Sequence, residues 1–569
     1  MHNIAFVLLR RIRSPLIVLI CVYATSMLGF VIIPGMDDHG EPWQMDFFHA
    51  FYFVSFMGST IGFGEIPYPF TNAQRMWTTV TIYSSVIAWL YAIGSLLSIV
   101  QDPAFRTLNR QNAFRRSISR IKSPFYLICG YGETSALLIK ALTEAGIRSV
   151  VIDADQDRLN SLELEDYPLP VPGLCADVSL PEILVMGGLK NRYCVGCVAL
   201  TDHDSINLKV ALTSKLLNPS LKVIARAETQ DAALNIASFG TDEIINPFET
   251  FAGRLALALH SPSMFMLFEW MTGVPHEPLC KPIYPPHGTW ILCGYGRFGK
   301  AVHKRLVAEG VSATIIEEKP EMTEAPEGTV VGRGTEANTL LEADIENAVG
   351  IVAGTDDDSN NLSIVMTARE LNPNLFIVAR KNRRANASIF QAAQTSLTMQ
   401  RGSVIAHKIF ALITTPLLAE FLRLATKQNN AWAETLIERV STIADDEAPQ
   451  IWTVNINATD APSFSHAIAN GSRPKLHELY AHPCNRDDAL PIFSLLLKRK
   501  SGETLLPDGN TLLEPDDQLL ICGQHDIRNQ MEWVLKNSNV FHYIHTGEER
   551  AQGWLWRKFV DKKSTTKKP

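Results

Sequence analysis

The sequence predicts a helical membrane part followed by two doubly wound α/β domains and a small α+β domain. Two long segments near the start are apolar and uncharged, which indicates membrane helices. Two glycine-rich turns, each between an apolar strand and a helical segment, predict the α/β domains. Strand and turn patterns near the end predict the third domain.

Residues 15–33 and 76–100 contain no charged side chain. A helix needs about 20 apolar residues to cross the hydrocarbon core of a bilayer, so both segments are long enough. The alternative for the first is a cleaved signal peptide, but its apolar run is too long and no small-residue cleavage motif follows. We therefore expect two membrane spans.

The apolar segment 47–58, between the two spans, is too short to cross and predicts a re-entrant helix. Charge predicts the orientation, because Lys and Arg concentrate on the cytoplasmic side. Basic residues precede the first span and follow the second, whereas Arg75 is the only Lys or Arg between the spans. We expect a multi-pass protein of the inner (plasma) membrane with both termini in the cytoplasm.

The loop Thr60-Ile61-Gly62-Phe63-Gly64-Glu65 follows the re-entrant segment. A dehydrated cation needs a ring of oxygen ligands, which backbone carbonyls can supply. Glycine tolerates the backbone angles that point successive carbonyls the same way. The pattern predicts an ion-selective filter over residues 60–64 with Glu65 at its outer mouth. An anchoring loop without this role is the alternative.

This loop resembles the Thr-x-Gly-Tyr/Phe-Gly-Asp signature of potassium channels, which implies K⁺ as the ion and four chains around one filter. Phe63 stands where Tyr is commoner, and Glu65 where Asp is commoner. Gly94, within the second span, is a candidate gating hinge or equally a close-packing residue.

About 470 residues follow the membrane part, enough for roughly three domains. The formal net charge of −7 and the lack of a basic stripe argue against nucleic acid as a partner. The nine cysteines are scattered, which argues against a disulfide framework. Cys194-x-x-Cys197 lies in a segment whose pattern predicts a buried strand. A zinc site would need two further ligands nearby, and the sequence shows none, so we interpret the two cysteines as structural.

The remainder of the chain contains an internal repeat. Leu127–Ser135 returns as Ile291–Gly299 at an offset of 164, and Thr201–Asn207 returns as Thr355–Asn361 at an offset of 154. Shared landmarks of this kind indicate duplication of one domain.

Each copy has the strand, Gly-x-Gly turn and helix that bind a nucleotide pyrophosphate at the helix N-terminus. The acid that ends the next strand can bond a ribose and would repel a 2′-phosphate, which favours NAD or an adenine nucleotide over NADP. The candidate binding residues are Gly294, Gly296, Arg297, Gly299 and Glu317 in the second copy, and Gly130, Gly132, Ser135, Asp153 and Asp177 in the first. Glu133 beside the first loop disfavours phosphate, so we rank the second loop as the better site; the first is alternatively an empty scaffold.

Asp356 and Asp358 are candidate Ca²⁺ ligands, or else members of a solvated loop.

These repeated residues resemble tandem RCK domains (regulator of K⁺ conductance, also called KTN or TrkA-N). With the pore-like part, the chain resembles prokaryotic two-transmembrane potassium channels. The resemblance implies a homotetramer with eight RCK domains in a cytoplasmic gating ring, a TrkA-C-like C-terminal lobe, and broken helices, interrupted at Pro262 and Pro416, that serve dimer packing. A core helix within one domain is the alternative for those helices.

The Pro-Asp-Gly segment 506–510 predicts a hairpin turn in the lobe. The predicted parts are a pore domain over 1–100, a linker over 101–122, a first RCK domain over 123–272, a linker over 273–286, a second RCK lobe over 287–426, a C-terminal lobe over 427–545 and a basic tail over 546–569.

The predicted function is a ligand-gated, potassium-selective channel whose ring senses a nucleotide, with Ca²⁺ as a second candidate ligand. Two alternatives remain: a membrane-anchored NAD-dependent oxidoreductase and a subunit of a potassium uptake transporter. No constellation for hydride transfer accompanies the glycine-rich loops, so we do not expect an enzyme. A single pore loop and fused RCK domains argue against the transporter.

Overall fold

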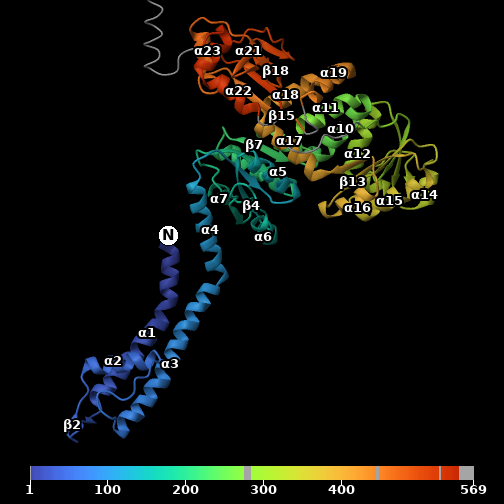
Figure 1. Ribbon diagram of the computed structural model, residues 1–569. Helices are drawn as coiled ribbons and strands as arrows, with labels where there is room; N and C mark the ends of the chain where they lie inside the picture. Colours follow the sequence, from blue (N-terminus) through green and yellow to red (C-terminus); the bar gives the residue numbers. More distant parts are fainter. Residues whose placement is uncertain (1, 274–282, 444–447, 525–526, 550–569) are drawn as a thin grey trace, which may run out of the picture. The chain divides into compact units, whose positions relative to one another are not determined.

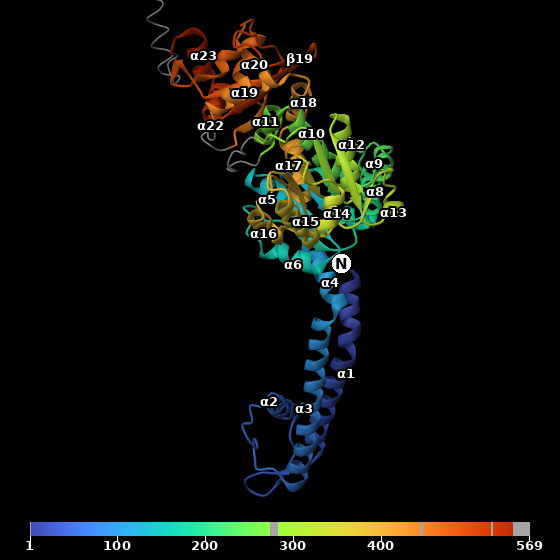
Figure 2. The ribbon, with the colours of Figure 1, turned by 90° about the vertical axis from the view of Figure 1, so that its right-hand side faces the viewer.

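The computed structural model describes residues 2–273, 283–443, 448–524 and 527–549. The chain forms two compact units, residues 1–120 and 121–569, which are described in turn (Figure 1, Figure 2). Most of the predicted linker 273–286 and of the predicted tail 546–569 lies outside the described residues.

The first unit is helical, with one two-stranded ribbon between its first two helices. Its elements are α1 (His2–Ile32), β1 (Gly35–Met36), β2 (Pro42–Trp43), α2 (Phe47–Gly58), α3 (Asn72–Gln101) and α4 (Pro103–Arg120). Among the described residues, Ile12–Ile32 and Asn72–Ser98 form straight helices long and apolar enough to cross a membrane. The two membrane helices of the predicted fold are thus present, and the expected linker 101–122 is mostly the helix α4.

Indole and aromatic side chains join the helices of this unit. Trp77 Nε1 donates to the carbonyl oxygen of Ser26 at 3.0 Å, and Trp89 Nε1 donates to the Tyr23 hydroxyl at 3.0 Å, so two indole groups of α3 are bonded to α1. The short helix α2 begins at Asp46, whose carboxylate accepts the His49 N–H. Its inner face packs into an aromatic core. The core holds α2 between the two long helices.

The second unit contains two six-stranded parallel sheets with the same strand order. The first runs β5 (Gly173–Cys175), β4 (Arg148–Asp153), β3 (Phe125–Cys129), β6 (Cys194–Ala199), β7 (Lys222–Arg226), β8 (Glu243–Ile245). The second runs β11 (Val330–Val331), β10 (Ser312–Glu317), β9 (Thr289–Cys293), β12 (Gly350–Ala353), β13 (Phe376–Lys381), β14 (Leu397–Gln400). In each sheet the strand order reverses beside the first strand along the chain, which is β3 in the first sheet and β9 in the second. Doubly wound nucleotide-binding folds have the same arrangement. The duplication and the fold class predicted from the sequence are confirmed.

Helices connect the strands of each sheet. The first set is α5 (Glu133–Glu144), α6 (Gln156–Leu164), α7 (Pro181–Met186), α8 (Asp204–Leu217) and α9 (Gln230–Ala237). The second set is α12 (Arg297–Ala308), α13 (Pro320–Thr323), α14 (Ala337–Glu342), α15 (Asp358–Leu371), η1 (Arg384–Asn386) and α16 (Ala387–Ala392). In each copy the glycine-rich turn leads from the first strand into the first helix.

A broken helix pair follows each sheet: α10 (Pro247–His260) with α11 (Pro262–Thr272), and α17 (Arg401–Thr414) with α18 (Pro416–Ala425). The second pair is apolar enough to span a membrane but bends by 112°, because Pro416 cannot continue α17.

Helices α10 and α17 are exchanged between the two sheets. Phe248 and Phe251 of α10 share a core with Phe298 of the second copy, while Ile405 and Ile409 of α17 share a core with residues of the first copy. The alternative of a core helix within its own domain is therefore wrong for α10 and α17. The exchange joins the two copies into one unit.

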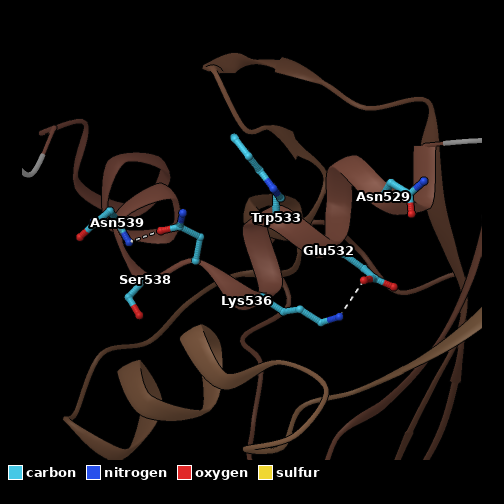
Figure 3. A pocket seen from close by; sticks show the side chains of 7 residues that line it. Asn529, Glu532, Trp533, Lys536, Ser538 and Asn539 are labelled. Carbon is cyan, nitrogen blue, oxygen red and sulfur yellow. Dashed lines mark hydrogen bonds and ion pairs between the residues drawn. The ribbon is translucent and has the colours of Figure 1, made fainter. Parts of the chain in front are cut away.

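The C-terminal lobe is a small α+β fold around a four-stranded antiparallel sheet. Its elements are α19 (Asn430–Ser441), β15 (Gln450–Asn455), α20 (Pro462–Ala469), α21 (Leu476–Leu479), β16 (Ala481–His482), β17 (Asn485–Ala489), β18 (Ile492–Arg499), β19 (Gly502–Leu505), β20 (Gln518–Gly523), α22 (Ile527–Lys536) and α23 (Ser538–Thr546). The strand order is β15-β20-β18-β19. At the corner between α22 and α23, Trp533 is exposed beside the ion pair of Glu532 and Lys536 (Figure 3).

The hairpin turn predicted over 506–510 is wrong. The tight turn lies at 500–501, between the paired strands β18 and β19. Residues 506–510 belong to the longer connection from β19 to β20, and β20 pairs with β18 and β15 instead. Pro, Asp and Gly mark a chain reversal, but they do not specify which strands pair.

Candidate functional site

The loop after α2 has an alternating backbone. Thr60, Gly62 and Gly64 have φ values of 63°, 66° and 101°, in the left-handed region. Ile61 and Phe63, between them, are outside that region. Glycine adopts it without strain, whereas a β-branched residue such as Thr60 is held there by its surroundings. Alternation of this kind can direct successive carbonyl oxygens toward one side, which is the geometry expected of residues 60–64.

One side of this loop packs within the chain and the other is open. The Phe63 ring lies 5.4 Å from the Phe56 ring of α2, edge to face. At Gly62 and Gly64, apart from the residues adjacent in sequence, no described residue has an atom within 4 Å of the position where a Cβ would stand. Ile61 and Phe63 remain 60% and 65% exposed. A single chain therefore supplies only one wall of any enclosed path.

The carboxylate of Glu65 is neutralised within the chain. Arg75 donates to its two oxygens at 2.8 and 3.1 Å, and the Phe70 N–H donates to it at 2.8 Å. From the sequence we expected Glu65 at the outer mouth and Arg75 as the only Lys or Arg between the spans. The ion pair between these two residues was not predicted. The structure therefore has an ion pair at Glu65 instead of a free negative charge, and the place of Glu65 at the mouth of a pore stays a prediction.

Gly94 lies in the C-terminal half of α3, and among the described residues outside its own helical turns none has an atom within 4 Å of its Cβ position. No other described segment therefore packs closely on Gly94. A packing partner would have to come from another molecule, and the hinge role stays a prediction.

The first glycine-rich loop joins β3 to α5. Gly130 has a φ of 99°, and a Cβ there would lie 2.9 Å from the backbone of Leu200. Ser135 Oγ donates to the Gly130 carbonyl at 2.6 Å. Asp153, at the end of β4, accepts the Tyr131 N–H at 2.6 Å. The predicted residues Gly130, Gly132, Ser135 and Asp153 thus lie around one turn.

The second loop, between β9 and α12, is tighter. A Cβ at Gly299 would lie 2.0 Å from the Gly294 carbonyl oxygen, so only glycine fits there. Glu317 accepts the Tyr295 N–H at 2.6 Å. In both copies the terminal acid of the second strand therefore holds the loop by a hydrogen bond. Contact of these acids with a ribose stays a prediction.

Arg158 of α6 lies beside the first loop, and the sequence analysis did not identify it. Its guanidinium donates to Asp202 at 2.9 Å and lies 3.8 Å from Asp153. One of its nitrogens lies 4.0 Å from the Cβ position of Gly132. A cation therefore stands at the loop that Glu133 was expected to disfavour for phosphate. The signal in the sequence was a basic residue five positions after the ribose-binding candidate.

Arg297 joins the second loop to the first copy. Its guanidinium lies 2.6 Å from the carboxylate of Glu228, which follows β7 and is 7% exposed. Glu228 is also paired with Arg226, and Arg226 lies 3.3 Å from Asp202. The arginine expected to attract phosphate already has an acidic partner.

The remaining candidates, Asp177, Asp356 and Asp358, lie outside the two glycine-rich loops. Asp177 is exposed after β5 and accepts the Ser179 N–H at 2.8 Å, which lowers its pKa. Asp358 accepts hydrogen bonds from the Asn382 and Arg383 backbone and from Asn386. Asp356 is exposed in the preceding turn.

The geometry does not support the metal ligands expected from the sequence. In the described part of the chain, no three His, Cys, Asp or Glu residues come together as a group that could hold a metal ion. The donors around Asp358 occupy the oxygens that a cation would need. Cys194 is buried in β6, and burial raises its pKa to about 12, which opposes the thiolate form that a metal requires.

Two protein families match this chain in sequence. Residues 17–102 match an ion channel family, and residues 126–247 and 290–399 match the TrkA-N domain family. The chain carries one ion channel domain and two TrkA-N domains. The ion channel domain contains α2 and the two apolar helices, so the chain is a membrane protein.

Several relatives share these domains. Potassium channel protein 1 of Methanocaldococcus jannaschii is 28% identical over a stretch that covers 37% of this chain and 60% of that protein. The voltage-gated potassium channel Kch of Escherichia coli is 25% identical over 35% of this chain and 46% of its own length. This chain therefore matches less than two thirds of the length of these relatives. A solved structure of the GsuK channel bound to NAD is 16% identical, covers 95% of this chain and 100% of its own, and has a TM-score of 0.46.

Proposed function

We propose that the protein is a potassium-selective channel whose TrkA-N domains bind a nucleotide and thereby regulate the pore. The observation that carries this proposal is the alternating backbone of Thr60, Gly62 and Gly64 between two membrane helices. Carbonyl oxygens directed to one side can replace the water around a dehydrated K⁺. The potassium channels among the relatives support the choice of K⁺.

The functional assembly is a homotetramer with its eight TrkA-N domains in one ring. The open side of residues 60–64 supports this assembly, because four equivalent loops are needed to surround an ion. Basic residues lie at the start of the first apolar span and after the second, namely Arg10, Arg11 and Arg13 in the N-terminal part of α1 and the arginines of α4. They support an orientation with both termini in the cytoplasm and a location in the inner (plasma) membrane.

The regulatory ligand is NAD, NADH or an adenine nucleotide. Asp153 and Glu317, beside the two glycine-rich loops, would repel the 2′-phosphate of NADP. Binding can change the pore only by as much as the nucleotide prefers one state of the ring over the other. The exchange of α10 and α17 supports such coupling, because the two TrkA-N domains share cores and cannot move independently.

Planar bilayers containing the purified full-length protein test the proposal. We expect a K⁺ current under K⁺ and Na⁺ gradients, with a reversal potential near that of K⁺, that changes when NAD⁺, NADH, ADP or ATP is added. No cation current with any of these additions would refute a channel. Steady NADH consumption with a candidate substrate, in the absence of current, would support the oxidoreductase instead.

The matched variants Gly296→Asp and Gly132→Asp identify the sensing copy. Each adds a carboxylate at an equivalent helix N-terminus, where no atom lies closer than 4.0 Å to the new Cβ. We expect Gly296→Asp to abolish the nucleotide response and leave the current. A retained response in Gly296→Asp with loss in Gly132→Asp would assign sensing to the first copy.

A further inference from the structure

A pocket of about 580 Å³ lies where the broken helices α10, α11, α17 and α18 meet, beside α12. Figure 1 shows these helices, in green and orange, together between the two sheets and the C-terminal lobe. The pocket contains no residue of either glycine-rich loop. Its volume is typical of sites for small organic ligands.

The polar part of this pocket is basic. Four basic residues and one acidic residue line it: Arg254, Arg305, Lys408, Arg423 and Glu249. Three of the basic residues have carboxylate partners: Arg254 with Glu269 at 2.9 Å, Arg305 with Glu249 at 3.5 Å, and Arg423 with Glu503 at 3.1 Å. Lys408 has no carboxylate within 4.0 Å among the residues that the structure describes. Burial lowers its pKa.

The charge of Glu243 acts on Lys408 without direct contact and opposes the lowering of its pKa. The duplication explains why no carboxylate contacts Lys408. At the offset of 154, Pro262 corresponds to Pro416, Arg254 to Lys408, and Glu269 to Arg423. In the first broken helix the basic residue pairs with Glu269. In the second, an arginine occupies the position of that glutamate. The second copy has therefore exchanged an internal ion pair for two positive charges that line the same pocket.

Arg254 adds a second unmet polar group. Its Nε is buried and, within the described residues, has no hydrogen-bond partner. Buried donors are rarely left unpaired, because each costs free energy unless an acceptor is present. Arg254 and Lys408 both line this pocket, and the charge of Arg254 lowers the pKa of Lys408, so one acceptor in the pocket can approach both.

The pocket also has an apolar lining. Leucines and one phenylalanine from all four helices form it: Leu257, Phe268, Leu412, Leu418 and Leu422. An inorganic ion would leave this surface wet, whereas an organic body would cover it. The lining therefore suits a molecule with one anionic end and one apolar end.

We propose that this pocket binds a small organic anion, with its carboxylate or phosphate group at Lys408 and Arg254 and its apolar body against Phe268 and Leu412. The ligand contacts both exchanged helices at once and so stabilises the junction between the two TrkA-N domains. The site is separate from the nucleotide loops and does not depend on the channel function.

Titration calorimetry on the full-length protein in lipid nanodiscs tests this proposal with phenyl phosphate as the probe. We expect saturable binding that is at least about tenfold tighter than that of inorganic phosphate or of the neutral benzyl alcohol. Lys408→Met removes the ammonium and keeps an unbranched chain, so we expect binding to weaken at least about tenfold. Lys304→Met removes a positive charge from the exposed face of α12 and should leave the affinity unchanged.

Thermal unfolding gives a readout that separates binding from a purely structural role. Without ligand, Lys408→Met should unfold at a higher temperature than the wild type, because it removes a buried charge that lacks a partner. With phenyl phosphate, the wild type should gain stability and Lys408→Met should not. Equal binding by Lys408→Met and the wild type, or no preference for phenyl phosphate over inorganic phosphate, would overturn the proposal. Loss of binding in the double variant Gly132→Asp, Gly296→Asp would also overturn it and assign the probe to the glycine-rich loops.

Discussion

The guanidinium of Arg297 lies 2.6 Å from the carboxylate of Glu228, so the second glycine-rich loop is bonded to the first TrkA-N domain. Arg297 begins α12, where a bound phosphate would approach, and Glu228 follows the fifth strand of the other sheet. A phosphate at this loop must therefore share Arg297 with Glu228 or replace it. The proposed nucleotide binding at the second loop would in this way be tied to contacts of the first domain.

The first prediction concerns competition for Arg297. Glu228→Gln removes the competing charge. Because Arg297 is 56% exposed although Glu228 is buried, we expect ADP binding to strengthen only about two- to fivefold, as for a solvent-screened ion pair. Arg297→Gln should weaken binding about tenfold by removing a charge-assisted donor. Equilibrium dialysis with labelled ADP measures both effects. Lys304→Gln, two turns along the same helix, is the matched control and should bind ADP as the wild type does.

The second prediction compares the third small residue of the two glycine-rich loops. We expect its substitution to destabilise the protein more in the second loop than in the first. Gly299→Ala places a Cβ 2.0 Å from the Gly294 carbonyl oxygen, so the loop must deform. We expect a loss of more than about 2 kcal/mol in the free energy of unfolding. Ser135→Ala, at the corresponding position, loses only the hydrogen bond to Gly130 and should cost about 1 kcal/mol. Thermal unfolding compares them, and equal losses would contradict the difference between the loops.

Periodic and repeated features of the fold could be predicted from the sequence. Uncharged runs determined the two spans, and the predicted re-entrant segment 47–58 coincides with α2. Glycine-rich turns between apolar strands and helices determined the two sheets, because local geometry requires glycine at Gly130 and Gly294.

Relationships between distant side chains could not be predicted. The apolar pattern of α10 and α17 shows that each is buried, but it carries no information about which sheet covers it. The pairs Arg297–Glu228 and Arg75–Glu65 depend on tertiary structure, since a charge pattern does not identify partners. The donors that bond the Asp358 carboxylate follow 24 to 28 residues later in the chain. The sequence near Asp358 does not show that its oxygens are occupied, so Asp358 resembled a metal ligand.

A third prediction separates Asp358 from Asp356. Asp358→Asn turns an amide toward donors that now bond a carboxylate, and we expect a cost of about 1–3 kcal/mol. Asp356→Asn, in the exposed turn, should change stability by less than about 0.5 kcal/mol. Thermal unfolding with and without CaCl₂ measures both. A Ca²⁺-dependent gain in stability that Asp358→Asn removes would restore the metal site.

The pH dependence of Asp358 follows from its surroundings. Burial raises its pKa, but the hydrogen bonds from Asn382, Asn386 and Arg383 outweigh burial and lower it below the ordinary value of 3.8. A carboxyl group with a lowered folded-state pKa contributes stability above its unfolded pKa and loses it as pH falls through the folded value. The stability difference between the wild type and Asp358→Asn should therefore shrink below about pH 4. A difference that stays constant down to pH 2 would contradict this.

The last prediction rests on the proposed channel and concerns the ion pair of Arg75 and Glu65, which we expect at the outer mouth. Arg75→Gln frees the carboxylate, which should concentrate K⁺ near residues 60–64 and raise the single-channel conductance at low ionic strength. In 1 M KCl the Debye length is only about 3 Å, so the variant and the wild type should then conduct alike. The double variant Arg75→Gln, Glu65→Gln has no net charge at this site, as the wild type does, and should restore wild-type conductance at low ionic strength. A conductance increase in Arg75→Gln that persists at high salt, or in the double variant, would point to an altered loop structure instead of an electrostatic effect.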